Sequence, residues 1–257
     1  MKKTKEKFNV GEIYLIRKVG AGSENIFIDK KDYSRFLLGL EFYNSKDNVN
    51  LWRFFFCRQK KCKNNKNDVL RTKKDDFFEE FKKNLWKKRL ENSKKHQKGR
   101  KIISLLGFTL LPKSYYLLAL EIEKNGISRF MHKMGGYSSY FNRRHNRRGV
   151  LFRSQYECWR IKDKARAINI LNMLHIRPIE RCIREEKIFC SEDKRMRKKE
   201  LLDKLNKYRY SSFLDYIGGW NFASVTNRGF LLDYLRGKDN YRKYLEKYLE
   251  QRINMVK

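Results

Sequence analysis

Acidic residues and proline are scarce in this sequence, and long apolar runs are missing. Its 257 residues include 29 Asp and Glu against 62 Lys and Arg, and only two Pro. No apolar run reaches the roughly 18 residues that a membrane-spanning helix needs. The basic residues at the start are not followed by the apolar region of a signal peptide. We therefore expect a cytoplasmic protein that no linker-like segment divides.

Cysteine is also sparse, and its spacing argues against disulfides and zinc. Cys57 and Cys62 are close together, but neither a second cysteine pair nor a pair of histidines accompanies them. The five cysteines, an odd number, are Cys57, Cys62, Cys158, Cys182 and Cys190. We interpret all five as free thiols.

Cations and aromatic rings, by contrast, are abundant. The formal net charge is +33, 14% of residues are aromatic and 40% are hydrophobic. The hydrophobic fraction is enough for a packed core, which argues against wholesale disorder. So large a positive charge repels itself unless an anion is near. Cations mixed with rings suit phosphates and bases, so we expect nucleic acid as the partner rather than an acidic protein or a membrane surface. The alternative is an ordinary soluble protein from a lysine-rich genome.

Hydrophobic patterns predict strands and helices in mixed order. The expected strands cover residues 12–18, 102–110 and 115–122, with a further extended stretch over 150–160. The expected helices cover residues 32–43, 126–144 and 163–176, and in the tail about 197–207, 227–236 and 239–253. Asp32 and Asp163 are the predicted N-caps of the first and third of these helices. The strands at 102–110 and 115–122 are almost wholly apolar, so we expect them centrally in a covered sheet.

Residues 44–101 have a different character from the rest of the chain. From Arg58 to Lys101, 18 Lys and Arg stand against 6 Asp and Glu. Apolar residues recur at helical spacing among the lysines around 74–91. We interpret the segment as a basic insertion with one amphipathic helix. The alternative is a solvated charge run without a partner.

Six segments, taken in order, resemble the motifs of a known family. The first reads Leu-Pro-Lys-Ser-Tyr-Tyr-Leu-Leu at 111–118. The others lie at 126–131, 140–147, 149–153, 174–179 and 210–218. Together they resemble the REP-associated tyrosine transposases, which are HUH single-strand endonucleases.

The resemblance implies an α+β, ferredoxin-like fold, in which an antiparallel sheet carries helices on one face. We expect this domain over residues 8–180, interrupted by the insertion at about 44–101. A mainly helical extension is expected over 181–257. The order of strands and helices predicted from the patterns agrees with this fold.

The resemblance also implies a chemistry whose residues this chain has replaced. In the family, two His on a strand hold Mg²⁺ or Mn²⁺ and a helical tyrosine attacks the phosphate. An Asn one helical turn after that tyrosine sits where a third metal ligand is expected. The corresponding positions here hold Ser114, Tyr116, Met173 and Arg177. Hydroxyls are poor metal ligands, Met173 cannot form a phosphate ester, and Arg177 repels a cation. We therefore expect no metal cofactor and no cleavage, and Arg177 could hold a phosphate instead.

Other residues offer alternatives for the missing groups. A relocated nucleophile would come from Tyr115, Tyr116, Tyr137 or Tyr140, although packing or base stacking suits each of them better. His132, His145 and His175 are dispersed in the sequence, and we expect His175 to be a helix histidine with its hydrogen bonds satisfied.

The expected nucleic-acid interface is an arginine-rich stretch with interleaved rings. Its residues are Arg143, Arg144, Arg147, Arg148, Arg153, Tyr156, Trp159, Arg160, Lys162 and Arg177. The leading hypothesis is a catalytically inactive relative of the transposases that binds single-stranded or hairpin DNA. An active transposase with a relocated tyrosine and a structural RNA-binding protein are the alternatives.

Overall fold

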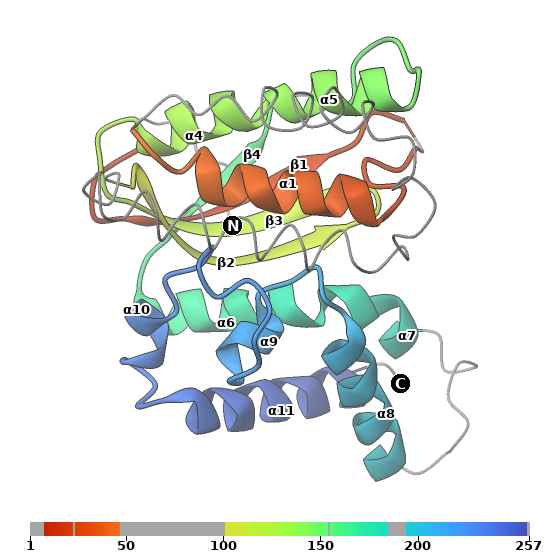
Figure 1. Ribbon diagram of the computed structural model, residues 1–257. Helices are drawn as coiled ribbons and strands as arrows, with labels where there is room; N and C mark the ends of the chain where they lie inside the picture. The colour runs from red at the N-terminus through yellow and green to blue at the C-terminus, as the bar shows by residue number, and fades with distance from the viewer. Residues whose placement is uncertain (1–7, 23, 47–100, 154, 185–193, 256–257) are drawn as a thin grey trace, which may run out of the picture.

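A computed structural model describes residues 8–22, 24–46, 101–153, 155–184 and 194–255. Figure 1 shows a sheet lying between two layers of helices. The amphipathic helix expected around 74–91, and most of the basic insertion, lie outside the described residues. None of the described helices combines the length and apolar character needed to cross a bilayer.

The sheet has four strands, and each neighbouring pair is antiparallel. The strands are β1 (Ile13–Val19), β2 (Ile103–Leu111), β3 (Ser114–Glu121) and β4 (Glu157–Ile161), in the order β2-β3-β1-β4. Among the described residues, α1 (Lys30–Phe42) lies between β1 and β2, and α4 (Gly126–Met134) and α5 (Gly136–Arg144) lie between β3 and β4. This βαββαβ connectivity, with β1 and β3 at the centre, is the ferredoxin-like arrangement. The predicted α+β class and antiparallel sheet are confirmed.

Three helices cover one face of the sheet, namely α1 (Lys30–Phe42), α4 (Gly126–Met134) and α5 (Gly136–Arg144). They pack an aromatic core against the sheet, in which Phe27, Phe36 and Tyr137 are in ring contact. The helix predicted over 126–144 is divided in two at Gly135.

The first helix is capped one turn earlier than the sequence predicted. Asp29, not Asp32, is its N-cap, and the Asp29 carboxylate accepts hydrogen bonds from the amides of Lys31 and Asp32. Asp32 is fully buried instead, and its carboxylate accepts from the amide of Ile28, 2.9 Å away. Both aspartates precede apolar residues at helical spacing, so either could cap the helix. Asp29 is the cap, and Asp32 is buried inside the first turn.

Helices also cover the opposite face, so the expectation of helices on one face only was wrong. That face carries α6 (Lys164–Ile176), η1 (Arg177–Ile179), α7 (Glu180–Arg184), α8 (Lys194–Lys207), α9 (Phe213–Tyr216), α10 (Gly229–Leu232) and α11 (Lys238–Asn254). Asp163 caps α6 as predicted and accepts from the amide of Arg166. Helices cover both faces of the sheet because both faces are apolar. In β3, Leu117 faces one core and Leu118 faces the other, so each face has to be shielded from water.

The tail also closes one edge of the sheet. The amide of Leu110 donates to the carbonyl of Tyr210 (2.9 Å), and that of Ser212 donates to Phe108 (3.0 Å). Further along, the amide of Asn227 donates to Leu105 at 2.7 Å. These bonds satisfy backbone groups of β2 that an open edge would leave unpaired.

Candidate nucleic-acid interface

Three of the four family-motif positions meet at one end of the sheet. Ser114 and Tyr116 lie on β3, two residues apart, on the face that α6 covers. Met173 is in the last turn of α6, and Arg177 is the residue that ends this helix. Direct contacts join Tyr116, Met173 and Arg177, and Ser114 lies at the same end of the strand.

Arg177 covers the ring of Tyr116. Its guanidinium carbon lies 5.1 Å from the ring centroid, within the range of a cation–π contact. Nη1 donates to the carboxylate of Glu180 at 2.6 Å, and Nη2 lies 3.9 Å from the sulfur of Met173. Glu180 also binds Arg252 at 3.1 Å. Arg177 is thus a fixed cation at a helix C-terminus, where the helix dipole favours it.

A second arginine, which the sequence analysis did not select, approaches the same ring. Arg17 is paired with Tyr116 across the β1–β3 ladder, and its guanidinium carbon lies 5.8 Å from the ring centroid. Arg17 also forms a 3.2 Å salt bridge with Glu157 on β4. The signal available in the sequence was the Arg-Lys pair that ends the first strand. Only the strand pairing, however, reveals that Arg17 faces Tyr116.

This cluster does not suit a divalent cation. Two guanidinium groups lie over Tyr116, and Glu157 and Glu180 are each salt-bridged to arginine. Within the described residues, no three His, Cys, Asp or Glu side chains come together in a way that could hold a metal. A metal ion here would have to displace an arginine and would meet positive charge. A phosphate, in contrast, would be attracted by the guanidinium groups.

The four tyrosines considered as relocated nucleophiles all lie in the core. Tyr115, Tyr116, Tyr137 and Tyr140 are each exposed by less than a tenth of their surface. Burial raises the pKa of Tyr140 to about 12 and raises the pKa of Tyr115 and Tyr137 further. Tyr137 also donates a 2.7 Å hydrogen bond to the carbonyl of Ile26. These are packing positions, and a buried, protonated phenol is a poor nucleophile.

The three histidines of the described residues lie apart from one another. His175 is fully buried, and its two ring nitrogens lie 2.6 Å from the Tyr241 hydroxyl and 2.8 Å from the Ser212 hydroxyl. The hydrogen bonds expected for His175 are therefore present. His145 binds the buried Asp32, and His132 is exposed on α4.

The predicted basic residues differ in how much charge they can offer. Arg144 is bonded to Asp29 and Asp32, Arg147 to Glu24, and Arg160 to Glu12. Arg143 is exposed at the end of α5. Within the described chain, Arg148, Arg153 and Lys162 are exposed and form no salt bridge. The last three therefore carry a charge that no carboxylate of the described chain neutralises.

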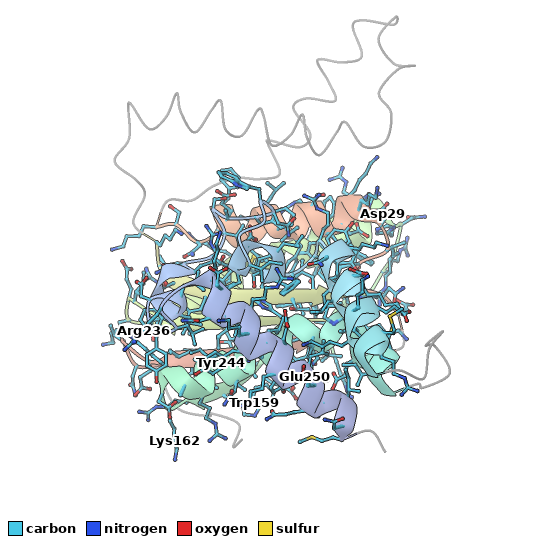
Figure 2. All side chains as sticks on the ribbon, turned by 90° about the horizontal axis from the view of Figure 1, so that it is seen from below. Asp29, Trp159, Lys162, Arg236, Tyr244 and Glu250 are labelled. Carbon is cyan, nitrogen blue, oxygen red and sulfur yellow. The ribbon has the colours of Figure 1, made fainter. Side chains whose placement is uncertain are left out.

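These residues do not form one continuous surface. The 143–153 segment lies beside the end of β1, because the amide of Arg153 donates to Val19 and Gly20 bridges to Phe152. Arg177 is at the same end of the sheet. Lys162 follows β4 at the other end, and Figure 2 shows Trp159 and Lys162 far from Asp29. Tyr156 packs against one core and Trp159 against the other.

Further cations complete the end of the sheet that holds Arg177. Lys18 lies with its Nζ 5.2 Å from the ring centroid of Phe152, and burial lowers its pKa. Lys113 is exposed in the β2–β3 turn. We call Arg17, Lys18, Lys113, Arg148, Arg153 and Arg177 the basic end. It brings together residues from four separate segments of the chain.

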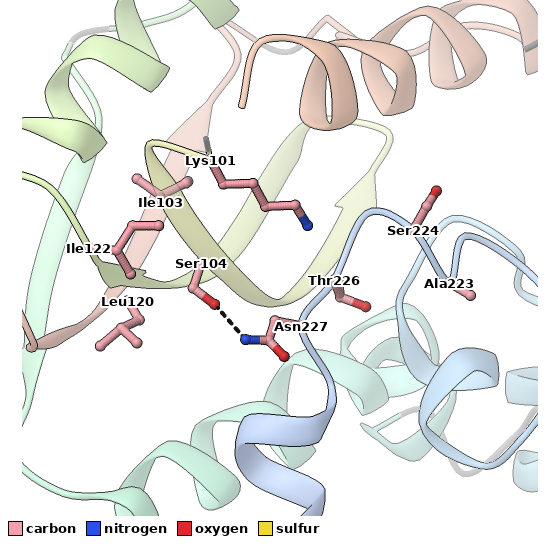
Figure 3. Close-up of a pocket in the computed structure, with 9 residues that line it drawn as sticks. All are labelled: Lys101, Ile103, Ser104, Leu120, Ile122, Ala223, Ser224, Thr226 and Asn227. Atoms are coloured by element: carbon pink, nitrogen blue, oxygen red, sulfur yellow. Dashed lines mark hydrogen bonds between the residues drawn. The ribbon is translucent and has the colours of Figure 1, made fainter. Parts of the chain in front are cut away.

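A pocket at the other end of the sheet is separate from the basic end. Its volume is about 410 Å³, and it lies between the start of β2 and residues 223–227. Figure 3 shows Ile122 and Leu120 on one side, Thr226 on the other, and Asn227 bonded to Ser104 between them. Lys101 is its only cation among the lining residues.

Comparisons with known proteins leave the chain without a family assignment. No family model matches it, and a search of curated proteins found no match. A solved structure of the REP-associated tyrosine transposase bound to a REP hairpin is similar over 86% of this chain and 90% of that one. Its sequence identity is 6% and its TM-score is 0.44. A likeness at this level carries no information on function.

Proposed function

We propose that this protein binds single-stranded or hairpin DNA at the basic end and does not cut it. The observation that carries the proposal is the pair of guanidinium groups, from Arg17 and Arg177, over Tyr116. The motif resemblance places a metal ion at this position in active enzymes. Here the same position attracts phosphate and repels the metal that phosphodiester cleavage would require.

The charges around Tyr116 support phosphate binding. The Arg17 and Arg177 side chains are 39% and 28% exposed, so a phosphate can reach their guanidinium groups. A guanidinium binds a phosphate through charge-assisted hydrogen bonds. Lys113, Arg148 and Arg153, exposed nearby, supply charge for the neighbouring phosphates of a strand.

A binding and cleavage experiment tests both halves of the proposal. Hairpin DNA with a single-stranded flank is incubated with the protein and Mg²⁺ or Mn²⁺, and the products are separated on a denaturing gel. We expect salt-dependent binding by fluorescence anisotropy, with neither cleavage nor a covalent adduct. An adduct through any tyrosine would show that the protein is an active nickase.

The structural RNA-binding alternative rests on the +33 charge and the basic insertion. Crosslinking in cells followed by sequencing of the bound nucleic acid separates it from the DNA-binding proposal. Recovery of mainly structured RNA, with little DNA, would favour the alternative.

A further inference from the structure

The loop after α9 displays one tryptophan almost completely to solvent. Trp220 is 84% exposed, more than any other large hydrophobic residue in the described chain. Tryptophan carries the largest apolar surface of any side chain and is normally much more buried. Within the described residues, its ring contacts no other ring and forms no hydrogen bond.

The backbone on both sides of Trp220 is nevertheless firmly held. The carboxylate of the buried Asp215 accepts the amides of Asn221 and Phe222, both at 3.0 Å. The amide of Gly219 donates to Leu214 at 2.8 Å. The Asn221 side chain donates to the carbonyls of Arg209 (2.7 Å) and Ser211 (3.2 Å). The indole is therefore exposed on a fixed loop, so binding to it orders little additional chain.

Two cations lie beside the loop that carries Trp220. The Nε of Arg209 lies 3.3 Å from the side-chain oxygen of Asn221, the residue after Trp220. A Cβ built on Gly218 would lie 3.1 Å from Nζ of Lys238. Both cations are exposed, and neither forms a salt bridge within the described chain. An exposed ring on a loop with two such cations beside it suits a nucleobase and its adjoining phosphates.

The strand pairing relates this loop to the basic end. Arg17, Tyr116, Thr109 and Ser211 are successive partners in one row across the sheet. Three strand spacings of about 4.8 Å put Ser211 about 14 Å from Arg17. Asn221 is bonded to Ser211, so Trp220 lies at the β2 edge of the row that begins at Arg17. A short single strand can span such a separation.

We propose that Trp220 stacks on an unpaired base of single-stranded DNA, with Arg209 and Lys238 contacting the adjoining phosphates. This inference rests on the proposed function and adds to it the site that distinguishes unpaired from paired DNA. A duplex hides the faces of its bases, so Trp220 contributes nothing to duplex binding.

The test measures fluorescence anisotropy with a labelled deoxyoligonucleotide, single-stranded or annealed to its complement. Trp220→Ala is expected to weaken single-strand binding roughly 5- to 150-fold, the range for loss of one stacked base. Duplex binding should be unchanged, and Trp220→Phe should retain most of the affinity. Tyr244→Ala, on α11, is the matched control because Tyr244 is also exposed, by 53%, and should have no effect.

The salt dependence separates stacking from charge. Trp220→Ala should leave the slope of log affinity against log salt unchanged, since no phosphate contact is lost. Arg209→Ala with Lys238→Ala should reduce the slope by about 1.4, at about 0.7 per phosphate on a single strand. Photocrosslinking of a strand containing bromouracil should map to Trp220.

The outcomes distinguish this inference from the proposed function. If the wild-type protein binds no DNA, the proposed function fails. The stacking inference alone fails if the wild type binds DNA and Trp220→Ala has the same affinity for the single strand. It also fails alone if Trp220→Ala weakens duplex binding as much as single-strand binding. Tighter, Trp220-dependent binding of the matched RNA strand would overturn the assignment to DNA.

Discussion

The guanidinium carbon of Arg177 lies 5.1 Å from the ring centroid of Tyr116. The first residue ends a helix and the second lies in a central strand, at positions where the motif resemblance implies two metal ligands. Arg177 and Tyr116 do not present two ligands to one ion. They contact each other directly as a cation–π pair. The pair gives the site both its packing and its positive charge.

Removing both arginines from this site should weaken DNA binding and its salt dependence. For Arg17→Ala with Arg177→Ala we expect about a tenfold loss for hairpin DNA and a salt slope smaller by about 0.7 to 0.9 per lost phosphate contact. Anisotropy titrations at several salt concentrations measure both quantities.

Arg166→Ala is the control for this variant, because Arg166 is exposed on the same helix, α6, near its opposite end. It removes one charge from the protein without touching Tyr116. An equal loss with Arg166→Ala would mean that overall charge, not the basic end, determines binding.

Restoring the family residues should create a metal site that the wild type lacks. We expect Ser114→His, Tyr116→His, Met173→Tyr and Arg177→Asn together to bind Mn²⁺, because imidazoles replace hydroxyls and the guanidinium is removed. Isothermal titration calorimetry measures the binding, and thermal unfolding checks that the variant folds. The variant that keeps Arg177 should bind Mn²⁺ much more weakly. Equal binding by both would show that Arg177 is no obstacle to the metal.

The fold was largely predictable because its signals are local. The apolar strands at 102–110 and 115–122 and the Asp163 cap each depend on neighbouring residues. The helical cover on the second face was missed because it depends on how the tail folds back. The expected tail helix at 227–236 is only the four-residue α10. Asn227 is bonded to Leu105 of β2 instead, and residues 233–236 form turns closed by local hydrogen bonds.

The site was less predictable because its partners are distant in sequence. Arg177 was recognised from a motif, but its neighbour Arg17 is 160 positions away and is brought near by the β1–β3 pairing. Conversely, Arg144 was selected for its charge, which salt bridges to Asp29 and Asp32 neutralise. Composition reports how many cations there are, whereas folding decides which of them are paired.

Stability should fall as the pH is lowered from about 6.5 toward 4, in part through His175. Burial lowers the pKa of His175 to about 3. Between that value and the ordinary value the unfolded chain binds a proton that the folded chain does not, so stability rises with pH there. His175→Gln should be less stable at pH 7.5 but should lose about 1.4 kcal/mol less per pH unit in this range. Urea unfolding at several pH values tests this, and equal slopes would contradict it.

Neutralising Asp32 should be far more damaging than neutralising Asp29. The Asp32 carboxylate is fully buried and binds Arg144 at 2.5 Å and His145 at 3.0 Å, whereas the Asp29 side chain is 44% exposed. Asp32→Asn should cost about 3 kcal/mol or more because it breaks a buried ion pair. Asp29→Asn should cost under about 1 kcal/mol, since Asn caps a helix well. Similar losses in urea unfolding would refute the distinction.

Two glycines that begin neighbouring helices should respond to alanine in opposite ways. A Cβ on Gly126 would lie 2.2 Å from the carbonyl oxygen of Ile102, so backbone would have to move. A Cβ on Gly136 would meet only the Tyr43 hydroxyl, at 3.8 Å. Gly126→Ala should therefore lose about 2 kcal/mol or more. Gly136→Ala should gain about 0.4–1 kcal/mol by restricting the unfolded chain. Both are measured by urea unfolding, and a Gly126→Ala protein as stable as the wild type would mean that the helix can move away from β2 at little cost.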